Sequence, residues 1–315
     1  MIDVGIVGVG TYLPEKTMKA AEIARLTNGV WSEDAVINKL GIKQRYLPGP
    51  DDGTQEMGAK AALKCLENTG VDPKEIDVIL CIGEEWKEYP LTTSACYIQD
   101  RIGATNAWGI DVQNRCCTCV SAMKIAADML RADDEINTIM ICGGYRNGDF
   151  VDFTDKDMSM MYNLSAGGGA IILKKNYGKN LLLGSKIMSD GSLARTAGVE
   201  IGGIAHPFTK DNIEEGYKSL RLLEPQKMKD RLNEVSMPNW YHCIDESLRQ
   251  AGMTRKDIGY LDVLHMKRSG HKGMLAELGL TEEQSIYLED YGADRFCSTT
   301  SLSPTECLTK SQVSA

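Results

Sequence analysis

The sequence predicts a layered α/β protein built by internal duplication. Short apolar runs alternate with helix-compatible segments along the chain, which is the pattern of strands and crossover helices. The order helix, glycine, linker, strand occurs at Leu66–Leu80 (LENTGVDPKEIDVIL) and recurs at Leu248–Leu264 (LRQAGMTRKDIGYLDVL). Ile98–Asp111 and Met274–Asp290 form a second pair of matching segments. Two copies in the same order favour a duplicated fold over two unrelated domains.

The elements of the first half follow from apolar periodicity and from glycine or proline at their ends. We expect strands at Asp3–Gly10, Ile76–Gly83, Thr138–Gly143 and Ser165–Leu173, and helices at Ala20–Leu26, Ser32–Leu40, Thr54–Thr69 and Thr92–Ile102. A further strand from Trp108 leads through polar residues into a helix that reaches Leu130. Gly8 and Gly10 lack the rest of a dinucleotide-binding fingerprint, so we expect a tight turn there. The glycines at 167–169 fit either a phosphate cradle or a close backbone approach.

Composition argues against several classes of function. The chain has 315 residues, of which 43% are hydrophobic and 25% charged, as in an ordinary globular protein. Its net charge of -9 and its lack of a basic run argue against a nucleic-acid surface. No apolar stretch has the length of a membrane span, and Met1 opens directly into strand-like sequence instead of a signal peptide. Ten cysteines without regular spacing then indicate reduced thiols and a cytoplasmic protein.

Cys116 is the candidate nucleophile. It lies in the segment Trp108–Met123 (WGIDVQNRCCTCVSAM), which begins as an apolar strand and continues as a helix. A side chain at such a joint points outward at the edge of a sheet, beside the N-terminus of the helix. Unpaired N–H groups and the helix dipole favour a thiolate there. The alternative is an inert core thiol, because most cysteines behave as small buried hydrophobes.

Cys116 and Cys119 also form a C-x-x-C spacing, which occurs in zinc sites and redox pairs. The sequence has no second C-x-x-C or C-x-x-H at finger-like spacing, so we expect no metal. A nucleophilic thiol instead needs a base elsewhere in the chain.

His265 is the candidate base. It follows the apolar run Leu261–Leu264, which is the second-half counterpart of the strand that ends at Leu80 and Cys81. A nucleophile after a strand of one repeat and an imidazole after a strand of the other would meet near the axis that relates the two copies. A histidine at a strand end can equally be a solvated or packed residue. The other three histidines are given no role.

Several separate stretches together resemble a thiolase-fold condensing enzyme, most closely the 3-oxoacyl-ACP synthase III family. The resemblance covers residues 4–292 and includes the opening GVGTYLPEK, the segment LGIKQRY and the stretch DVQNRCCTCVSAM. The last of these is similar to the family's D-x-x-x-x-C pattern, which carries the nucleophile onto Cys116. The tetrapeptide LHMK stands where the family has its base, which carries that role onto His265. Trp31 is similar to the tryptophan that packs on the adenine of coenzyme A.

The resemblance implies a layered α-β-α-β-α fold, with the nucleophile in residues 1–176 and the base in residues 177–292. It implies transfer of an acyl group from coenzyme A to Cys116, followed by attack of a carbanion that malonyl-ACP (or malonyl-CoA) forms by losing carbon dioxide. His265 would stabilise the developing enolate, and backbone N–H groups would hold the thioester oxyanion. The coenzyme A thioester is then a substrate, and no cofactor or metal is required. The implied partners are acyl-CoA, acyl carrier protein and a second copy of the chain.

The chain departs from the family pattern in three places. Lys39 stands where the family has an arginine, so a bidentate contact to coenzyme A becomes at most a point charge. The glycine-rich motif reads SAGGGA at residues 165–170 and lacks an aspartate. Residues 293–315 replace the expected asparagine, helix and final strand, and their content of serine and threonine predicts a loop or an altered tail. Because each lost oxyanion donor costs about a hundred- to a thousand-fold in rate, we expect a catalytically weak or inactive chain.

Two other functions stay open at the level of the sequence. The residues at 83–85 (GEE) are similar to the G-T-E of hydroxymethylglutaryl-CoA synthases, in which Glu85 would be the general acid/base and no decarboxylation would occur. The other is a non-catalytic subunit of an acyl-transfer assembly, which an altered end would permit. Carbon dioxide release separates the first alternative from the main prediction, and selective alkylation of Cys116 separates the second.

Overall fold

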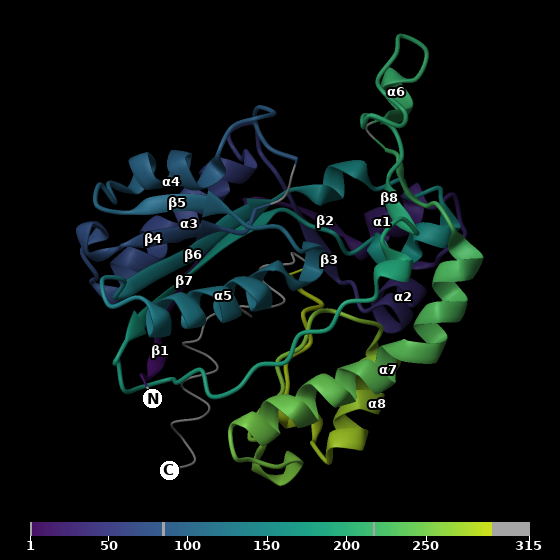
Figure 1. Cartoon of the computed structure of the whole chain (residues 1–315). Helices are drawn as coiled ribbons and strands as arrows, with labels where there is room; N and C mark the ends of the chain where they lie inside the picture. Colours follow the sequence, from purple (N-terminus) through teal and green to yellow (C-terminus); the bar gives the residue numbers. More distant parts are fainter. Residues whose placement is uncertain (1, 84–85, 217, 292–315) are drawn as a thin grey trace.

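A five-stranded mixed sheet organises the first half of the molecule. The computed structural model describes residues 2–83, 86–216 and 218–291. The strands of the sheet are β1 (Val4–Tyr12), β4 (Val78–Cys81), β5 (Trp108–Asp111), β6 (Thr138–Tyr145) and β7 (Gly167–Lys175). They lie in the order β1-β7-β6-β4-β5. The pairs β6-β4 and β4-β5 are parallel, whereas β1-β7 and β7-β6 are antiparallel. Figure 1 shows the sheet with helices on both faces.

The central strands are apolar on both faces because helices cover both faces. Every residue of β4 and β6 is buried, as is the first part of β7. Continuous apolar runs of this kind are typical of strands that are covered on both sides. The five strands predicted for this half are therefore confirmed, with small shifts at their ends.

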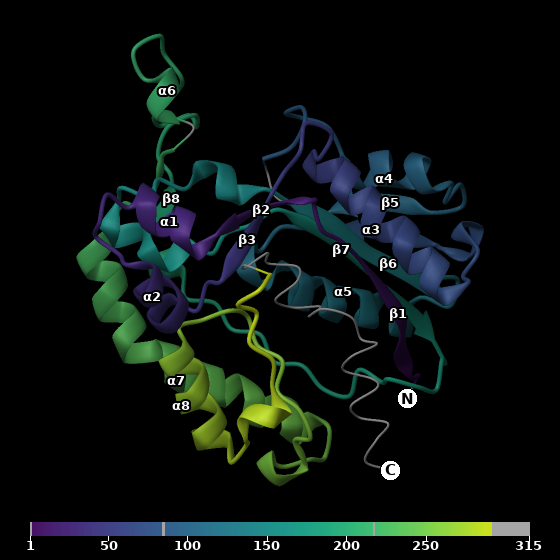
Figure 2. The ribbon, with the colours of Figure 1, turned by 180° about the vertical axis from the view of Figure 1, so that it is seen from behind.

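Two layers of helix enclose the sheet. Helices α3 (Thr54–Thr69) and α4 (Ser94–Ile102) pack on one face, and α5 (Thr118–Ala132) packs on the other. Figures 1 and 2 agree in placing α5 across the sheet from α3 and α4. Both α3 and α4 end at a glycine with left-handed backbone, Gly70 at φ 69° and Gly103 at φ 75°. Glycine adopts this conformation without a steric penalty, which makes it the usual stop signal of a helix.

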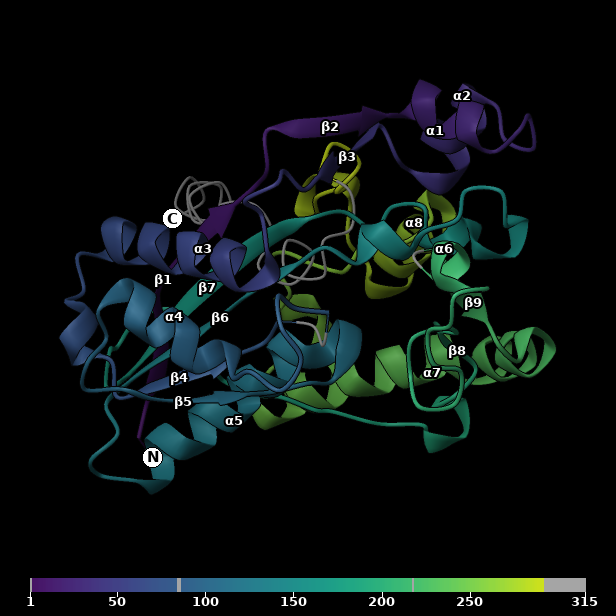
Figure 3. The same cartoon turned by 90° about the horizontal axis from the view of Figure 1, so that it is seen from above.

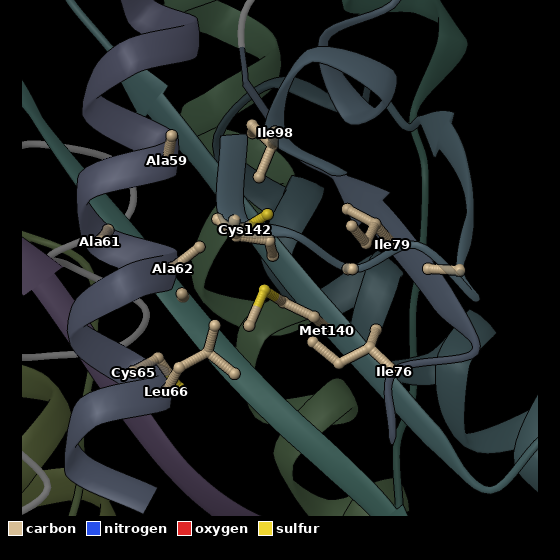
Figure 4. Close-up of a cluster of buried hydrophobic side chains, with 14 of the residues drawn as sticks. Ala59, Ala61, Ala62, Cys65, Leu66, Ile76, Ile79, Ile98, Met140 and Cys142 are labelled. Atoms are coloured by element: carbon tan, nitrogen blue, oxygen red, sulfur yellow. The ribbon is translucent and has the colours of Figure 1, made fainter. Parts of the chain in front are cut away.

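The core beneath α3 is made of small and branched side chains. Figure 4 shows Met140 and Cys142 of β6 among side chains that include Ala62 and Cys65 of α3. These four residues and Ile79 of β4 are 0% exposed. Alanine on the inner face lets the helix lie close to the sheet, and each fully buried large side chain stabilises the fold by roughly 1.5–3 kcal/mol.

The glycines of β1 serve close packing, which corrects the tight turn expected from the sequence. The strand continues through both glycines and pairs with β7. A Cβ on Gly10 would lie 2.2 Å from the backbone nitrogen of Cys65 and 2.3 Å from the carbonyl oxygen of Ala61, so α3 crosses β1 directly over this residue. In β7, a Cβ on Gly168 would lie 2.3 Å from the Met57 carbonyl oxygen. Close backbone approach, one of the two readings left open for that motif, accounts for its glycine.

The second half repeats the turn chemistry of the first. Helix α7 (Pro225–Gln250) is followed by Gly252 at φ 72° and by a 3₁₀ turn at Arg255–Asp257 that carries a capping box. The matching turn after α3, Pro73–Glu75, carries a capping box too. The two matching segments, Leu66–Leu80 and Leu248–Leu264, therefore end their helices in the same way in the structure.

The strand predicted at Leu261–Leu264 is wrong. Among residues 261–264 only Leu261 forms a β-bridge, which is parallel and joins it to Ser285. By contrast, β4 pairs along its whole length with a strand on each side. Helix α8 (Arg268–Leu278) follows and buries Met274 against aromatic side chains of α7. In this part of the second half, α8 therefore packs mainly against α7, and the bridge between Leu261 and Ser285 lies beside them.

The remaining elements form an outlying layer beside the sheet. Their bounds are β2 (Lys16–Lys19), α1 (Ala20–Leu26), α2 (Glu33–Ala35), a π turn (Val36–Leu40), β3 (Gln44–Leu47), β8 (Ala197–Val199), α6 (Ile213–Gly216) and β9 (Leu220–Leu222). Seen from above, α1, α2 and α8 lie to one side of the sheet (Figure 3). The loop that carries α6 projects from the body of the molecule (Figures 1 and 2). Among the described helices, none combines the length and apolar character needed to cross a membrane.

Candidate active site

Cys116 lies at the joint between β5 and α5, as the sequence predicts. It is the middle residue of a 3₁₀ turn, Arg115–Cys117, that leads directly into α5. The thiol is exposed. Arg115 has a φ of 51°, an uncommon conformation for a residue other than glycine. The chain therefore makes a sharp, strained turn that presents the next side chain at the surface, beside the N-terminus of a helix.

Polar contacts hold this turn in place. The backbone N–H of Asn114 donates to Thr118 Oγ1 at 2.8 Å, and the Thr118 hydroxyl donates to the Arg115 carbonyl at 2.6 Å. The Asn114 side-chain amide donates to Ser121 Oγ at 2.7 Å. Because Asn114 and Arg115, at the start of the turn, are both bonded to the first residues of α5, these local contacts fix the position of the Cys116 backbone.

The carboxylate that opens the D-V-Q-N-R-C stretch holds a neighbouring helix. Asp111 accepts hydrogen bonds from the backbone N–H groups of Ser94 and Ala95 at 3.0 and 2.8 Å, at the start of α4. Lys87 forms an ion pair with the same carboxylate at 3.1 Å. A carboxylate at a helix N-terminus satisfies unpaired N–H groups and favours the helix dipole. Asp111 therefore joins the strand before Cys116 to α4.

Three buried thiols of the chain are poor nucleophiles. Burial raises the pKa of Cys65 and of Cys81 to about 12, and it raises that of Cys142 well above its usual value. All three lie in the apolar core between the sheet and α3. Since the thiolate is the reactive form, these cysteines are inert at neutral pH.

His265 lies between the two halves of the chain, and a backbone carbonyl fixes its ring. Its Nε2 lies 3.1 Å from the carbonyl oxygen of Leu40. A carbonyl can only accept, so Nε2 carries the proton and donates, which leaves Nδ1 as the acceptor of the neutral ring. Burial lowers the pKa of His265, while the Leu40 carbonyl and the charge of Glu289 act in the opposite direction. The net effect lowers the pKa, which favours the neutral imidazole.

A cavity opens beside His265. It has a volume of about 230 Å³, and its walls include the side chains of Leu40, Ile42, Met160 and Met266. Polar groups on its walls come from Ser159, Asn163, His265 and Lys267. A mostly apolar space with a few polar side chains is typical of a small-molecule site. Cys116 is not among the residues that line this cavity.

The contact between Leu40 and His265 brings together two segments that the sequence singled out separately. The segment around Lys39 was expected to contact coenzyme A, and His265 was expected to be the base. Lys39 itself is exposed at the end of the π turn, one residue before Leu40. The structure places the Leu40 carbonyl against the His265 ring, whereas among the described contacts none links Cys116 to His265.

Two further expected site residues lie elsewhere. Trp31 is half-buried and packs against the apolar cluster formed by α1 and its neighbours, and its indole nitrogen is buried without a hydrogen-bond partner in the described part of the chain. Glu85 lies outside the described residues, as do residues 293–315. The roles proposed for Trp31, Lys39 and Glu85 stay predictions.

Sequence reasoning missed two buried polar residues at this site. Asn163 is 7% exposed and lines the 230 Å³ cavity, and Glu289 is 3% exposed and forms an ion pair with Arg268. The sequence did contain a signal for Glu289, because the match between Ile98–Asp111 and Met274–Asp290 aligns the end of β5 with residues 286–290. In both copies a carboxylate at this point reaches the first turn of the preceding helix, Asp111 toward α4 and Glu289 toward Arg268 of α8.

Comparison with known sequences places these residues in a family context. Residues 110–191, which include Cys116, match the family model of 3-oxoacyl-[acyl-carrier-protein (ACP)] synthase III. A beta-ketoacyl-[acyl-carrier-protein] synthase III of Sulfurovum sp. is 25% identical over 214 residues, covering 68% of this chain and 62% of that protein. The protein of the same description from Allorhizobium ampelinum is 27% identical over 288 residues, covering 90% and 83%. The chain spans just under two thirds of the Sulfurovum protein and of its Syntrophomonas wolfei counterpart, at 62% and 64%.

Solved structures share the fold across nearly the whole chain. The 3-oxoacyl-[acyl-carrier-protein] synthase III of Aquifex aeolicus aligns with a TM-score of 0.77 at 18% identity, covering 98% of this chain and 92% of that one. The priming β-ketosynthase of the R1128 polyketide pathway aligns with a TM-score of 0.75 at 21% identity, covering 92% and 83%. The layered thiolase-like fold predicted from the sequence is confirmed by these matches.

Proposed function

We propose that this chain, which resembles 3-oxoacyl-ACP synthase III in sequence and fold, is an acyltransferase of that type. It takes an acyl group from acyl-CoA onto Cys116 and condenses it with malonyl-ACP or malonyl-CoA. The observation that carries the proposal is the exposed Cys116 on a strained turn at the N-terminus of α5, inside the segment that matches the family. The strained turn presents the sulfur beside the N-terminus of a helix, a position that is typical of reactive cysteines.

The first half-reaction uses the Cys116 thiol, and His265 assists it as the base. The Cys116 thiolate attacks the thioester carbonyl, and the tetrahedral oxyanion collapses to expel the coenzyme A thiolate, which takes up the proton that the Cys116 thiol gave up. In this proposal Trp31 packs on the adenine ring and Lys39 contributes a positive charge toward the coenzyme A phosphates. The exposed position of Lys39 is compatible with a contact to a phosphate in solvent.

The second half-reaction uses His265. Malonyl-ACP loses carbon dioxide, and the resulting carbanion attacks the acyl-Cys116 carbonyl to give a 3-oxoacyl-ACP and a free thiol. The Nε2–H of His265 would leave the Leu40 carbonyl and donate to the enolate oxygen of the substrate in the cavity beside it. A neutral ring that already carries its proton on Nε2 has the tautomer that this step requires.

We infer that two copies of the chain assemble through the edge of the sheet at β5. Trp108 is 50% exposed and Ile110 is 46% exposed, and these residues alternate with Gly109, which faces α4. An edge strand that exposes apolar side chains is a ready pairing surface. A cytoplasmic location, where acyl-CoA and acyl carrier protein occur, fits the expected reduced state of the cysteines.

Acylation of Cys116 can be tested directly. The purified chain is incubated with acetyl-CoA, and intact and peptide mass spectrometry should show one acetyl group on Cys116. The Cys116→Ala variant should gain none, while Cys96→Ala, which removes another exposed thiol, should be acetylated like the wild type. Acetylation spread over several thiols, or none in a folded protein, would contradict the proposal.

A second assay defines the condensation. Addition of malonyl-ACP should release carbon dioxide and 3-oxoacyl-ACP, whereas a hydroxymethylglutaryl-CoA synthase-like chain would instead consume acetoacetyl-CoA without gas release. We expect condensation to be slower than acylation, since residues 293–315 replace the asparagine motif that the family uses for condensation. A full rate of condensation would overturn the expectation of an impaired chain.

A further inference from the structure

Glu289 is a buried carboxylate for which the proposed reaction has no use. Its side chain is 4% exposed. Its Oε1 accepts a hydrogen bond from Arg268 Nε at 2.8 Å and a second from Arg268 Nη2, and its Oε2 lies 3.5 Å from Lys43 Nζ. Burying a charge is costly unless it is paired, and here one arginine and one lysine pair with it.

The same residue ties two distant parts of the chain together through its backbone. The Glu289 carbonyl accepts the backbone N–H of Lys43 at 2.8 Å and that of Gln44 at 3.3 Å. The side-chain amide of Gln44 donates to the Asp290 carbonyl at 2.7 Å. Residues 43–44, which follow the Lys39–Ile42 segment, are therefore held by the 289–290 segment through both backbone and side chain.

Gly41 separates the carboxylate from the imidazole of His265. A Cβ on Gly41 would lie 3.3 Å from His265 Cε1 and 3.8 Å from Glu289 Oε1. The three residues line one small space together with Arg268. The carboxylate and the ring thus face each other across a single residue without a side chain, and the carbonyl that holds the ring belongs to the residue before it, Leu40.

We propose that Glu289 is a positioning residue for His265. By holding Arg268 and Lys43, it fixes the loop whose Leu40 carbonyl receives the His265 Nε2–H, and it places a negative charge on the far side of Gly41 from the ring. This role of Glu289 rests on the proposed function in one respect, which is that His265 acts as the base. The geometry and its consequences for the ring exist without any substrate.

The negative charge of Glu289 changes the pKa of the His265 ring in a definite direction. Burial lowers the pKa of His265 and Glu289 raises it, so loss of the carboxylate should lower the pKa further. Other charged groups near the ring are Arg268 and His271 on α8, Lys267 beside the cavity and Lys43 on the opposite loop. All four are cationic or can become so. Asp290 also pairs with Lys43, at 3.2 Å, and Glu282 acts on Arg268 and His271, whereas Glu289 is the carboxylate whose charge acts on the His265 ring.

The test is an NMR titration of the histidine rings of the full chain without substrate. The His265 signal is identified by its loss in His265→Asn. Glu289→Gln should move the His265 titration midpoint to lower pH, and Glu289→Asp should restore it in part. Glu282→Gln is the matched control, because Glu282 pairs with Lys272 and influences His271 instead. Its His265 midpoint should stay at the wild-type value.

Lys43→Met is a second test, in which the His265 titration midpoint should move in the opposite direction. The Lys43 side chain is 47% exposed, so its loss should leave the fold intact. Removing this cation leaves the Glu289 charge less neutralised, and the His265 midpoint should rise. An unchanged midpoint in a folded Glu289→Gln or Lys43→Met protein would show that Glu289 is merely structural and overturn the proposal. Failure of Cys116 acylation would instead sink the proposed function and leave this result standing.

Discussion

Burial and hydrogen bonding change the pKa of the His265 ring in opposite directions. Burial disfavours the imidazolium, while the Leu40 carbonyl and the Glu289 charge favour it, and the first effect is larger. His271, on the next helix, is 3% exposed and has its pKa lowered mainly by burial and next by His265. Its Nε2 lies 2.7 Å from Ser285 Oγ, which in turn donates to the Leu261 carbonyl. The neutral form is therefore favoured for both rings.

This predicts a loss of stability in mild acid. A histidine whose pKa is lower in the folded chain binds its proton first in the unfolded chain, so the free energy of unfolding falls as the pH drops below the ordinary value of 6.5. Denaturant unfolding at pH 7.5 and pH 5.5 should show this fall. The double variant His265→Gln/His271→Gln should be less stable at pH 7.5 but should lose less between the two pH values.

The control for this pH effect is His206→Gln, which changes an exposed residue in the loop before α6. It should show the wild-type fall in stability. An equal fall in the double variant would mean that other groups, such as the paired carboxylates, dominate the acid sensitivity.

At the scale of elements, close contact between α3 and β1 depends on a residue without a side chain. The distance of 2.2 Å from a Cβ on Gly10 to the Cys65 backbone nitrogen leaves no room for a methyl group. Flexible side chains cannot relieve this clash, because the atoms it meets belong to the helix backbone. The helix or the strand would have to shift as a whole.

We therefore expect Gly10→Ala to lower the free energy of unfolding by about 1–3 kcal/mol, the usual range for overpacking. The matched substitution is Gly273→Ala in α8, where no atom lies within 4 Å of the added Cβ. Alanine there should stabilise by roughly 0.5–1 kcal/mol, because glycine is a poor residue inside a helix. Chemical denaturation of both variants measures the difference, and a neutral Gly10→Ala would refute the packing argument.

At the scale of the whole molecule, the sheet ends in an exposed apolar edge. β5 pairs with β4 on one side, and Trp108 and Ile110 are exposed. We expect the wild-type chain to sediment as a dimer, and Trp108→Lys/Ile110→Lys to sediment as a monomer with unchanged secondary structure. Leu183→Glu is the control, because Leu183 is 51% exposed in another segment. A wild-type monomer at micromolar concentration would rule out this interface.

Much of the fold could be predicted because it is encoded locally. The apolar runs of β4, β6 and β7 and the stop glycines after α3 and α4 give each element its own signal within a few residues. The same holds for the turn at Cys116, since a strand, polar residues and a helix follow one another in the sequence. The prediction failed at Leu261–Leu264, because an apolar run becomes a strand only where neighbouring strands complete its ladder.

What the sequence alone determined is therefore the order of the elements, the repeat and the residue at the head of α5. Tertiary structure decided that Gly10 lies under a helix, that the Leu40 carbonyl holds His265 and that Glu289 faces this ring across Gly41. Leu40 and Gly41 are more than 200 positions from His265 and Glu289, and no local pattern in the sequence predicts these contacts. They follow from how close two backbones come, which only the packed chain fixes.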